Sequence, residues 1–276
     1  MRHLKVKNPL EGLRKFKPIL AQCHQGQRKI GVNEGSLYMY DNCFQHICEA
    51  QPYVVQNIQF DSQYGYQKLY GQCRNLIKPL NIGGDHSVAS SSVLASLQKF
   101  RNLHVIWIDA HPDIHTYSST VSGNTHGTPL SVCTGIEKTH WASRLSLKKL
   151  GFENLIYVGI RDIDDFERET IDRNNIKHWD VKQTVDWLRA NRHLPIHISF
   201  DIDALDPSYI SSTGTRVDEG MHPHEVREII VDAMAEDQLK SLDVVEFNQE
   251  LGDPVKSVHH VREVFRDFFP NEFPTK

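Results

Sequence analysis

The 276-residue sequence lacks the features that mark several common classes of protein. It has no apolar run of about 18 residues, the length that a membrane-spanning helix needs. Its net charge of −4 comes from acidic and basic residues mixed along the chain, so neither nucleic acid nor a membrane is predicted as a partner. It also has no Pro-, Gly- or Ser-rich linker, internal repeat or low-complexity tract. We therefore predict a single domain over residues 1–276.

Paired cysteines are missing as well. The five cysteines are odd in number and form no CxxC motif, and the N-terminus has no apolar segment typical of a signal peptide. Residues 1–17 are basic, but the first predicted strand begins almost at once and leaves little to be cleaved as a transit peptide. Reduced thiols and a cytoplasmic location are therefore predicted.

Short apolar runs alternate with longer helix-like stretches along the chain. Several short runs are continuously apolar, as in strands of a parallel sheet buried on both faces. The predicted strands are Lys17–Cys23, Tyr53–Phe60, Pro79–Ile82, Leu103–Ile108, Leu155–Ile160, Asn175–His178, Ile196–Phe200 and Leu242–Val245. The predicted helices are Ser62–Leu76, Ser87–Phe100, Asp180–Asn191, Pro223–Ala235 and Pro254–Phe269, with a further helix start at Thr128 and Pro129. This order predicts an α/β fold, a three-layer α/β/α domain with a mainly parallel, roughly eight-stranded sheet.

Acidic residues and histidines gather directly after four of the predicted strands. The segments are GGDHS (residues 83–87), DAHPD (109–113), DIDALDP (201–207) and Glu246. Because the carboxyl ends of strands line the ligand crevice of an open parallel sheet, the four segments are predicted to converge. Each has an ordinary explanation when taken alone: a DxD pair can cap a turn, and Asp85 can cap the next helix. Their presence together at separate strand ends favours a functional site.

The spacing within these segments favours bound cations. In an extended chain, residues two apart point to the same side, so each segment can present several ligands to one small volume. Carboxylates packed so closely repel one another unless cations neutralise them. Four carboxylates and two imidazoles, without a thiolate, exceed what one ion needs and favour two Mn²⁺ ions over a structural Zn²⁺. The predicted ligands are His86, Asp109, His111, Asp113, Asp201 and Asp203.

These motifs resemble those of the ureohydrolase (arginase/agmatinase) family, and most closely those of its arginases. The three family motifs are present as GGDHS, DAHPD and SFDIDALDP (199–207). Further matches in the family's order are GQRKIGV (26–32), SGNTHG (122–127), GIRDID (159–164), TGT (213–215) and LDVVE (242–246). The resemblance implies two Mn²⁺ per subunit, bridged by Asp109 and Asp201. One ion would also bind His86 and Asp113, and the other His111 and Asp203.

The resemblance also implies a reaction. L-arginine would be hydrolysed to L-ornithine and urea by attack of a metal-bridging hydroxide on the guanidinium carbon. Asp113 would orient the hydroxide, and Glu246 would pair with the guanidinium group. His126, within SGNTHG, would pass a proton to the leaving amine.

The same resemblance implies how the amino-acid end of the substrate is bound. Neutral donors after DAHPD would hold the α-carboxylate, and two carboxylates after GIR would hold the α-amino group. The implied contacts are Thr120, Ser122, Asn124, Asp164, Glu167 and Thr215. His115 stands where arginases usually carry an asparagine that helps to bind the α-carboxylate. We therefore expect substrate affinity to depend on pH between about 5.5 and 7.5, where histidine ordinarily changes charge.

Alternatives to arginine hydrolysis remain open. Arg216, where proline is usual, either favours a second carboxylate on the substrate or pairs with Asp218. The chain is alternatively an agmatinase or another guanidino or formimidoyl-amino-acid hydrolase, a zinc deacetylase, or an inactive regulatory relative. The expected partners are a small guanidino substrate and further copies of the chain in a homo-oligomer. Three other histidines are predicted to be packing or surface residues, and two to lie on a solvated helix: His104, His193 and His197, and His259 and His260.

Overall fold

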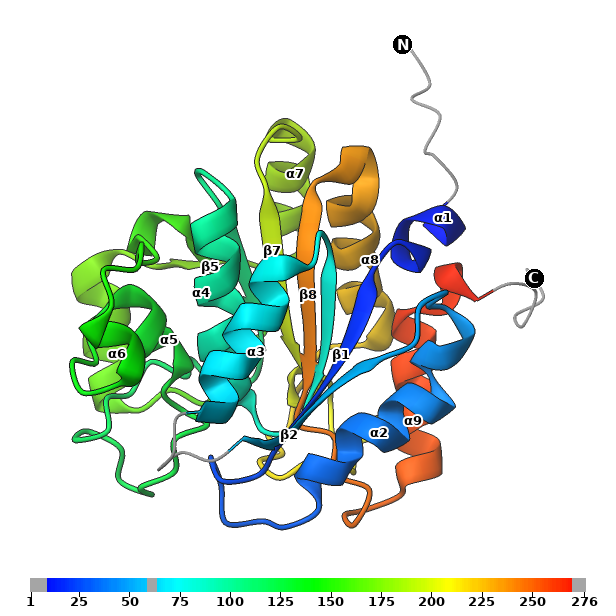
Figure 1. The fold of residues 1–276 in the computed structure, drawn as a ribbon, viewed down its shortest axis with the longest axis horizontal. Helices are drawn as coiled ribbons and strands as arrows, with labels where there is room; N and C mark the ends of the chain where they lie inside the picture. The colour runs from blue at the N-terminus through cyan, green and yellow to red at the C-terminus, as the bar shows by residue number, and fades with distance from the viewer. Residues whose placement is uncertain (1–8, 59–63, 270–276) are drawn as a thin grey trace.

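The computed structural model describes residues 9–58 and 64–269, which form an eight-stranded sheet between layers of helices (Figure 1). The strands are β1 Lys17–Cys23, β2 Tyr53–Ile58, β3 Pro79–Gly83, β4 His104–Ile108, β5 Leu155–Val158, β6 Lys177–His178, β7 Ile196–Asp201 and β8 Leu239–Val245. Every pairing between these strands is parallel, and their order is β2-β1-β3-β8-β7-β4-β5-β6. The predicted fold class is confirmed.

The helices are α1 Pro9–Arg14, α2 Val32–Asn42, α3 Tyr64–Asn75, α4 Ala89–Lys99, α5 Pro129–Thr134, α6 Asp165–Asn174, α7 Val181–Ala190, α8 Pro223–Met234 and α9 Pro254–Val264. Figure 1 shows α3 and α4 on one side of the sheet and α8 and α9 on the other. All predicted strands and helices are present within a few residues. The predicted end of the second strand, residues 59–60, and the predicted start of the next helix, residues 62–63, lie outside the described residues.

Helix α2 was not predicted because its start carries no usual capping signal. Its N-cap is Gly31, which has φ 102° and offers no side-chain hydrogen bond. Only glycine adopts this left-handed conformation readily, so glycine suits this position, where the chain turns into the helix. The predicted helix start at Thr128 is correct, with Pro129 in the first turn, although the Thr128 side chain makes no capping bond.

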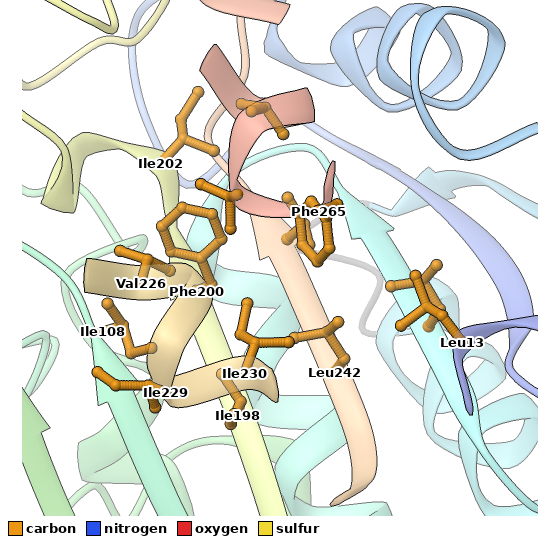
Figure 2. Packing of buried hydrophobic residues seen from close by; sticks show 14 of the residues in the cluster. Leu13, Ile108, Ile198, Phe200, Ile202, Val226, Ile229, Ile230, Leu242 and Phe265 are labelled. Carbon is orange, nitrogen blue, oxygen red and sulfur yellow. The ribbon is translucent and has the colours of Figure 1, made fainter. Parts of the chain in front are cut away.

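The two faces of the sheet bury separate apolar clusters. On one face, Ile198 and Phe200 of β7 pack in the same cluster as Ile229 and Ile230 of α8 (Figure 2). The other face packs against α3, α4 and α5. Burial of a side chain as large as Phe200 contributes about 2–3 kcal/mol, which explains why the inner strands are continuously apolar on this face.

The polar segments named above follow four adjacent strands, β3, β8, β7 and β4. Since all four run parallel, their carboxyl ends meet at one edge of the sheet. After β4 the chain has no helix or strand until α5, which leaves residues 109–128 as a long irregular loop beside this edge. In the part of the chain that the structure describes, no helix has the length and apolarity to cross a membrane.

Candidate metal centre

The first group of possible metal ligands surrounds His86, which follows β3. Its Nδ1 atom lies 3.0 Å from Asp109 Oδ2 and 3.1 Å from an oxygen of both Asp113 and Asp201. All four residues are buried. Nδ1 nevertheless makes no hydrogen bond of acceptable geometry among the described residues, so a buried polar atom faces three carboxylates without being satisfied.

The second group surrounds His111, beyond the end of β4. Its Nδ1 atom lies 3.4 Å from Asp109 Oδ1 and 3.4 Å from Asp203 Oδ2. Asp109 therefore offers one carboxylate oxygen to each group. Asp201 belongs only to the first group, so its role as a second bridge stays a prediction.

The spacing of these donor atoms fits divalent cations. Two ligands at right angles around a cation, with bonds of about 2.0–2.4 Å, lie about 2.8–3.4 Å apart. The separations of 3.0 Å in the first group and 3.4 Å in the second fall within this range. Carboxylate oxygens combined with imidazole nitrogens, without a thiolate, suit Mn²⁺. The residues present therefore fit two ions that share Asp109.

Three of the four carboxylates at the centre have pKa values above the ordinary value, which opposes their ionisation. Burial and the neighbouring Asp109 raise the pKa of Asp113 to about 6. Burial and neighbouring carboxylates also raise the pKa of Asp201 and of Asp203. Burial alone would raise the pKa of Asp109 too, but His111 and His86 hold it below its ordinary value. A buried group of repelling carboxylates is stabilised by a nearby cation.

The backbone bends sharply at the site. The expectation of an extended chain through both ligand segments is wrong, because Asp113 has φ 49° and Ile202–Ala204 forms a 3₁₀ turn directly after β7. The turn is stabilised by Asp201 Oδ1, which accepts a hydrogen bond of 2.8 Å from the Asp203 backbone N–H. Glu246 also has a positive φ, 69°. Such strained conformations in residues other than glycine concentrate at functional sites.

Glu246 lies against His126 at the same edge of the sheet. Its Oε1 atom accepts a hydrogen bond of 2.8 Å from the His86 backbone N–H and lies 3.0 Å from His126 Nδ1. Burial alone would lower the pKa of His126, but Glu246, Asp113 and Asp85 outweigh it and raise the pKa to about 9. Bound cations would oppose this rise. The two residues predicted to act on the guanidinium group and on the leaving amine are thus in direct contact.

The loop predicted to hold the substrate's α-carboxylate is folded by its own polar groups. The hydroxyl oxygens of Thr120 and Ser122 lie 3.2 Å apart. The Asn124 backbone N–H donates to Ser122 Oγ at 3.2 Å. Arg28 also donates to the backbone oxygen of Ser122 at 3.2 Å. Ser122 is exposed, and the other two predicted contacts are half-buried.

His115 pairs with one of the carboxylates predicted to bind the α-amino group. Its Nε2 atom lies 2.7 Å from Asp164 Oδ2, and its Nδ1 atom lies 2.9 Å from Ser119 Oγ. The ring also stacks on Phe166, and Glu167 Oε1 lies 3.9 Å from Nε2. Both ring nitrogens therefore already have partners within the protein, and binding of a substrate carboxylate by His115 would require one of these contacts to break.

Several residues that support the site were given no such role from the sequence. Trp107 stacks on His86, with ring centroids 4.1 Å apart, and its indole N–H donates to Asp109 Oδ2 at 3.0 Å. Thr215, for which substrate binding stays a prediction, donates a hydrogen bond to Asp203 Oδ2 at 2.8 Å. Arg161 donates to five backbone carbonyls and so fastens residues 203–204 to residues 217–218.

The remaining named residues lie in varied surroundings. His197 is fully buried and bonded to polar partners, His193 is exposed, and His104 is half-buried. Arg216 is exposed as well. On α9, the side chain of His259 is 60% exposed, as a solvated helix predicts, while His260 is mostly covered and bonded to Glu263.

A family model described as the arginase family matches residues 24–269, and this chain belongs to that family. An arginase of Plasmodium berghei is 37% identical over 197 residues, which cover 65% of this chain and 55% of the relative. For an arginase of Plasmodium falciparum the covered share of the relative is 47%. The chain thus spans about half the length of these curated relatives.

Solved structures share the fold over nearly the whole chain. The Entamoeba histolytica arginase, solved in complex with L-ornithine, gives a TM-score of 0.83 at 24% identity and covers 93% of this chain and 98% of that chain. The Bacillus subtilis arginase gives a TM-score of 0.79 at 25% identity, with 94% and 99% covered. The three-layer arrangement and its parallel sheet therefore agree with known arginases.

Proposed function

We propose that this chain is a binuclear manganese hydrolase that cleaves the guanidinium group of L-arginine to give L-ornithine and urea. One observation carries the proposal: two groups of donor atoms with the spacing of cation ligands share a single buried carboxylate, Asp109. Membership of the arginase family supports the same reaction. When bound, two divalent cations would lower the pKa of a water molecule and supply hydroxide near neutral pH.

The side chains around the donor groups would then position the substrate and move protons. Asp113, buried beside His86, accepts a hydrogen bond from the attacking group and orients it. Glu246 draws the guanidinium group to this edge of the sheet, where the substrate's cation competes with His126 for the Glu246 carboxylate. His126, released from that contact, donates its proton to the leaving amine.

The amino-acid end of the substrate would be held by the loop after β4 and by the start of α6. Thr120, Ser122 and Asn124 offer neutral hydrogen-bond donors to the α-carboxylate. Asp164 and Glu167 offer carboxylates to the α-amino group. The Entamoeba histolytica relative was solved in complex with L-ornithine, which supports an amino-acid ligand for this chain. A cytoplasmic location and a homo-oligomeric state remain predictions.

The test is urea release by the manganese-loaded protein from L-arginine, agmatine and 4-guanidinobutyrate, with formamide release from formimidoylglutamate measured alongside. We expect the highest kcat/KM for L-arginine, because the other substrates lack the α-carboxylate, the α-amino group or the guanidinium group. Asp109→Asn should abolish turnover of every substrate, whereas Asp186→Asn, on the exposed face of α7, should leave it unchanged. Preference for agmatine would overturn the substrate assignment but leave the metal centre intact, and an inactive loaded protein would overturn the enzyme assignment.

A further inference from the structure

A buried polar layer lies beneath the candidate metal centre, between α4 and the sheet. On β7, His197 and Ser199 alternate with apolar residues and point to the α4 side, where they pair in register with Ser241 and Asp243 of β8. All four are fully buried. A carboxylate in this position costs several kcal/mol unless it is well bonded, so the arrangement of its partners is informative.

Asp243 accepts hydrogen bonds on both oxygens. Asn81 Nδ2 donates to Oδ1 at 2.5 Å, and Ser92 Oγ of α4 donates to Oδ2 at 2.6 Å. His197 Nε2 lies 2.9 Å from Oδ2, and Ser199 Oγ lies 3.4 Å from the same oxygen. The carboxylate is therefore surrounded by donors. These partners hold its pKa below the ordinary value against the effect of burial.

The hydrogen bonds to Asp243 determine which atom is the donor in the hydrogen bond between Ser199 and His86. Because an ionised carboxylate only accepts, the Ser199 hydroxyl must donate its proton to Asp243. Ser199 Oγ is then left with lone pairs towards His86 Nε2, which lies 2.9 Å away. His86 Nε2 must therefore carry a proton and donate it to Ser199, and the lone pair of the ring is left on Nδ1. Nδ1 is the atom that faces the three carboxylates of the first donor group.

We infer that Ser199, backed by Asp243 and His197, is a positioning residue that holds His86 in the tautomer able to bind a cation through Nδ1. The inference rests on the proposed function and goes beyond it by naming the residues that prepare this ligand. Partners behind a metal-binding histidine typically change metal affinity by about 10–100-fold when they are removed. Stacking on Trp107 fixes the plane of the ring but does not select which nitrogen is protonated.

The experiment compares Ser199→Ala with Ser241→Ala. Both variants delete one buried hydroxyl from neighbouring strands, but Ser241 Oγ has no hydrogen-bond partner among the described residues. The metal-stripped proteins are titrated with Mn²⁺. In Ser199→Ala, the affinity of one of the two sites for Mn²⁺ should be about 10–100-fold weaker than in the parent. In Ser241→Ala, the affinities of both sites should stay within twofold of the parent. Thermal unfolding of each stripped variant checks that it is folded. If Ser199→Ala does not fold, Asp243→Asn should weaken the same site.

A second readout reports on the imidazole itself. In Zn²⁺-loaded protein labelled with ¹⁵N-histidine, the parent should show a slowly exchanging Nε2–H signal from His86, identified by its loss in His86→Asn. Ser199→Ala should shift or broaden this signal, and Ser241→Ala should not. A Ser199→Ala variant with the parent's Mn²⁺ affinities and an unchanged signal overturns the inference alone. A parent protein that binds no metal overturns the proposed function as well.

Discussion

Replacing His115 with asparagine tests how this chain treats the amino-acid end of its substrate. In the structure His115 Nε2 lies within hydrogen-bonding distance of Asp164 Oδ2. Asp164 is one of the carboxylates proposed to bind the substrate's α-amino group. The shorter asparagine side chain ends before the position of Nε2 and should remove this contact from Asp164 Oδ2, while Oδ1 still accepts the Glu167 backbone N–H. We therefore expect His115→Asn to bind L-arginine more tightly, because the substrate no longer has to displace an internal partner.

The size of the effect follows from the exposure of the pair. The Asp164 side chain is 45% exposed and that of His115 is 13% exposed. A charge-assisted hydrogen bond at a half-exposed site contributes about 1 kcal/mol, which is less than in a buried site. This corresponds to about a fivefold change in an equilibrium constant. The expected result is about a fivefold lower KM for L-arginine in His115→Asn.

The assay compares L-arginine with 5-guanidinovalerate, which differs only in lacking the α-amino group. His115→Asn should raise the kcat/KM ratio of the two substrates about fivefold. Ser119→Ala, which removes the partner of Nδ1 but keeps the Asp164 contact, should leave the ratio close to that of the parent. If His115 instead holds the α-carboxylate, both substrates should lose affinity equally and the ratio should stay constant. An unchanged pH profile of KM in His115→Asn would contradict the expected pH dependence of affinity.

Three further predictions concern metal, proton transfer and pH. Mn²⁺ at 100 times its dissociation constant should stabilise the stripped protein by about 2.7 kcal/mol per site, so Tm should rise by about 5–11 °C for each site that is filled; equal Tm values with and without chelator would contradict this. His126→Asn should lower kcat about 10²–10⁴-fold while two Mn²⁺ still bind, as titration would show. Burial, Asp113 and Asp164 raise the pKa of Glu167 to about 8. Between the pKa of Glu167 in the unfolded chain and about pH 8, the folded state therefore binds more protons than the unfolded state. The folded state loses stability as pH rises through this range. In urea unfolding of the stripped protein, Glu167→Gln should therefore gain stability relative to the parent from pH 5 to pH 8, and an unchanged difference would refute the shift.

The strands and most helices were predictable because their signals are local. Inner strands such as β4 are buried on both faces, and their apolar runs can be recognised without knowledge of the partner strands. The sequence indicates Asp85 as a possible cap, and its side chain does accept the Ser87 backbone N–H. The sequence pattern does not predict helix α2, because the conformation of Gly31 sets its first turn and no side chain caps it.

The ligand segments were predictable, whereas the layer behind them was not. Asp109, His111 and Asp113 are neighbours in the chain, and their position after a strand indicates where they meet other segments. His197 looked like a packing residue, and it is indeed buried, but its partner Asp243 lies 46 residues away on another strand. Only the pairing of β7 with β8 brings the two together, so no local pattern could reveal this contact.

The most direct test of the central claim is the number of Mn²⁺ ions bound per chain, measured by calorimetric titration of the metal-stripped protein. The two donor groups that share Asp109 predict a stoichiometry of two. They also predict that Asp109→Asn, which removes a ligand from both groups, weakens both sites together. Binding of one ion or none by the parent protein, or loss of only one site in Asp109→Asn, would contradict the account.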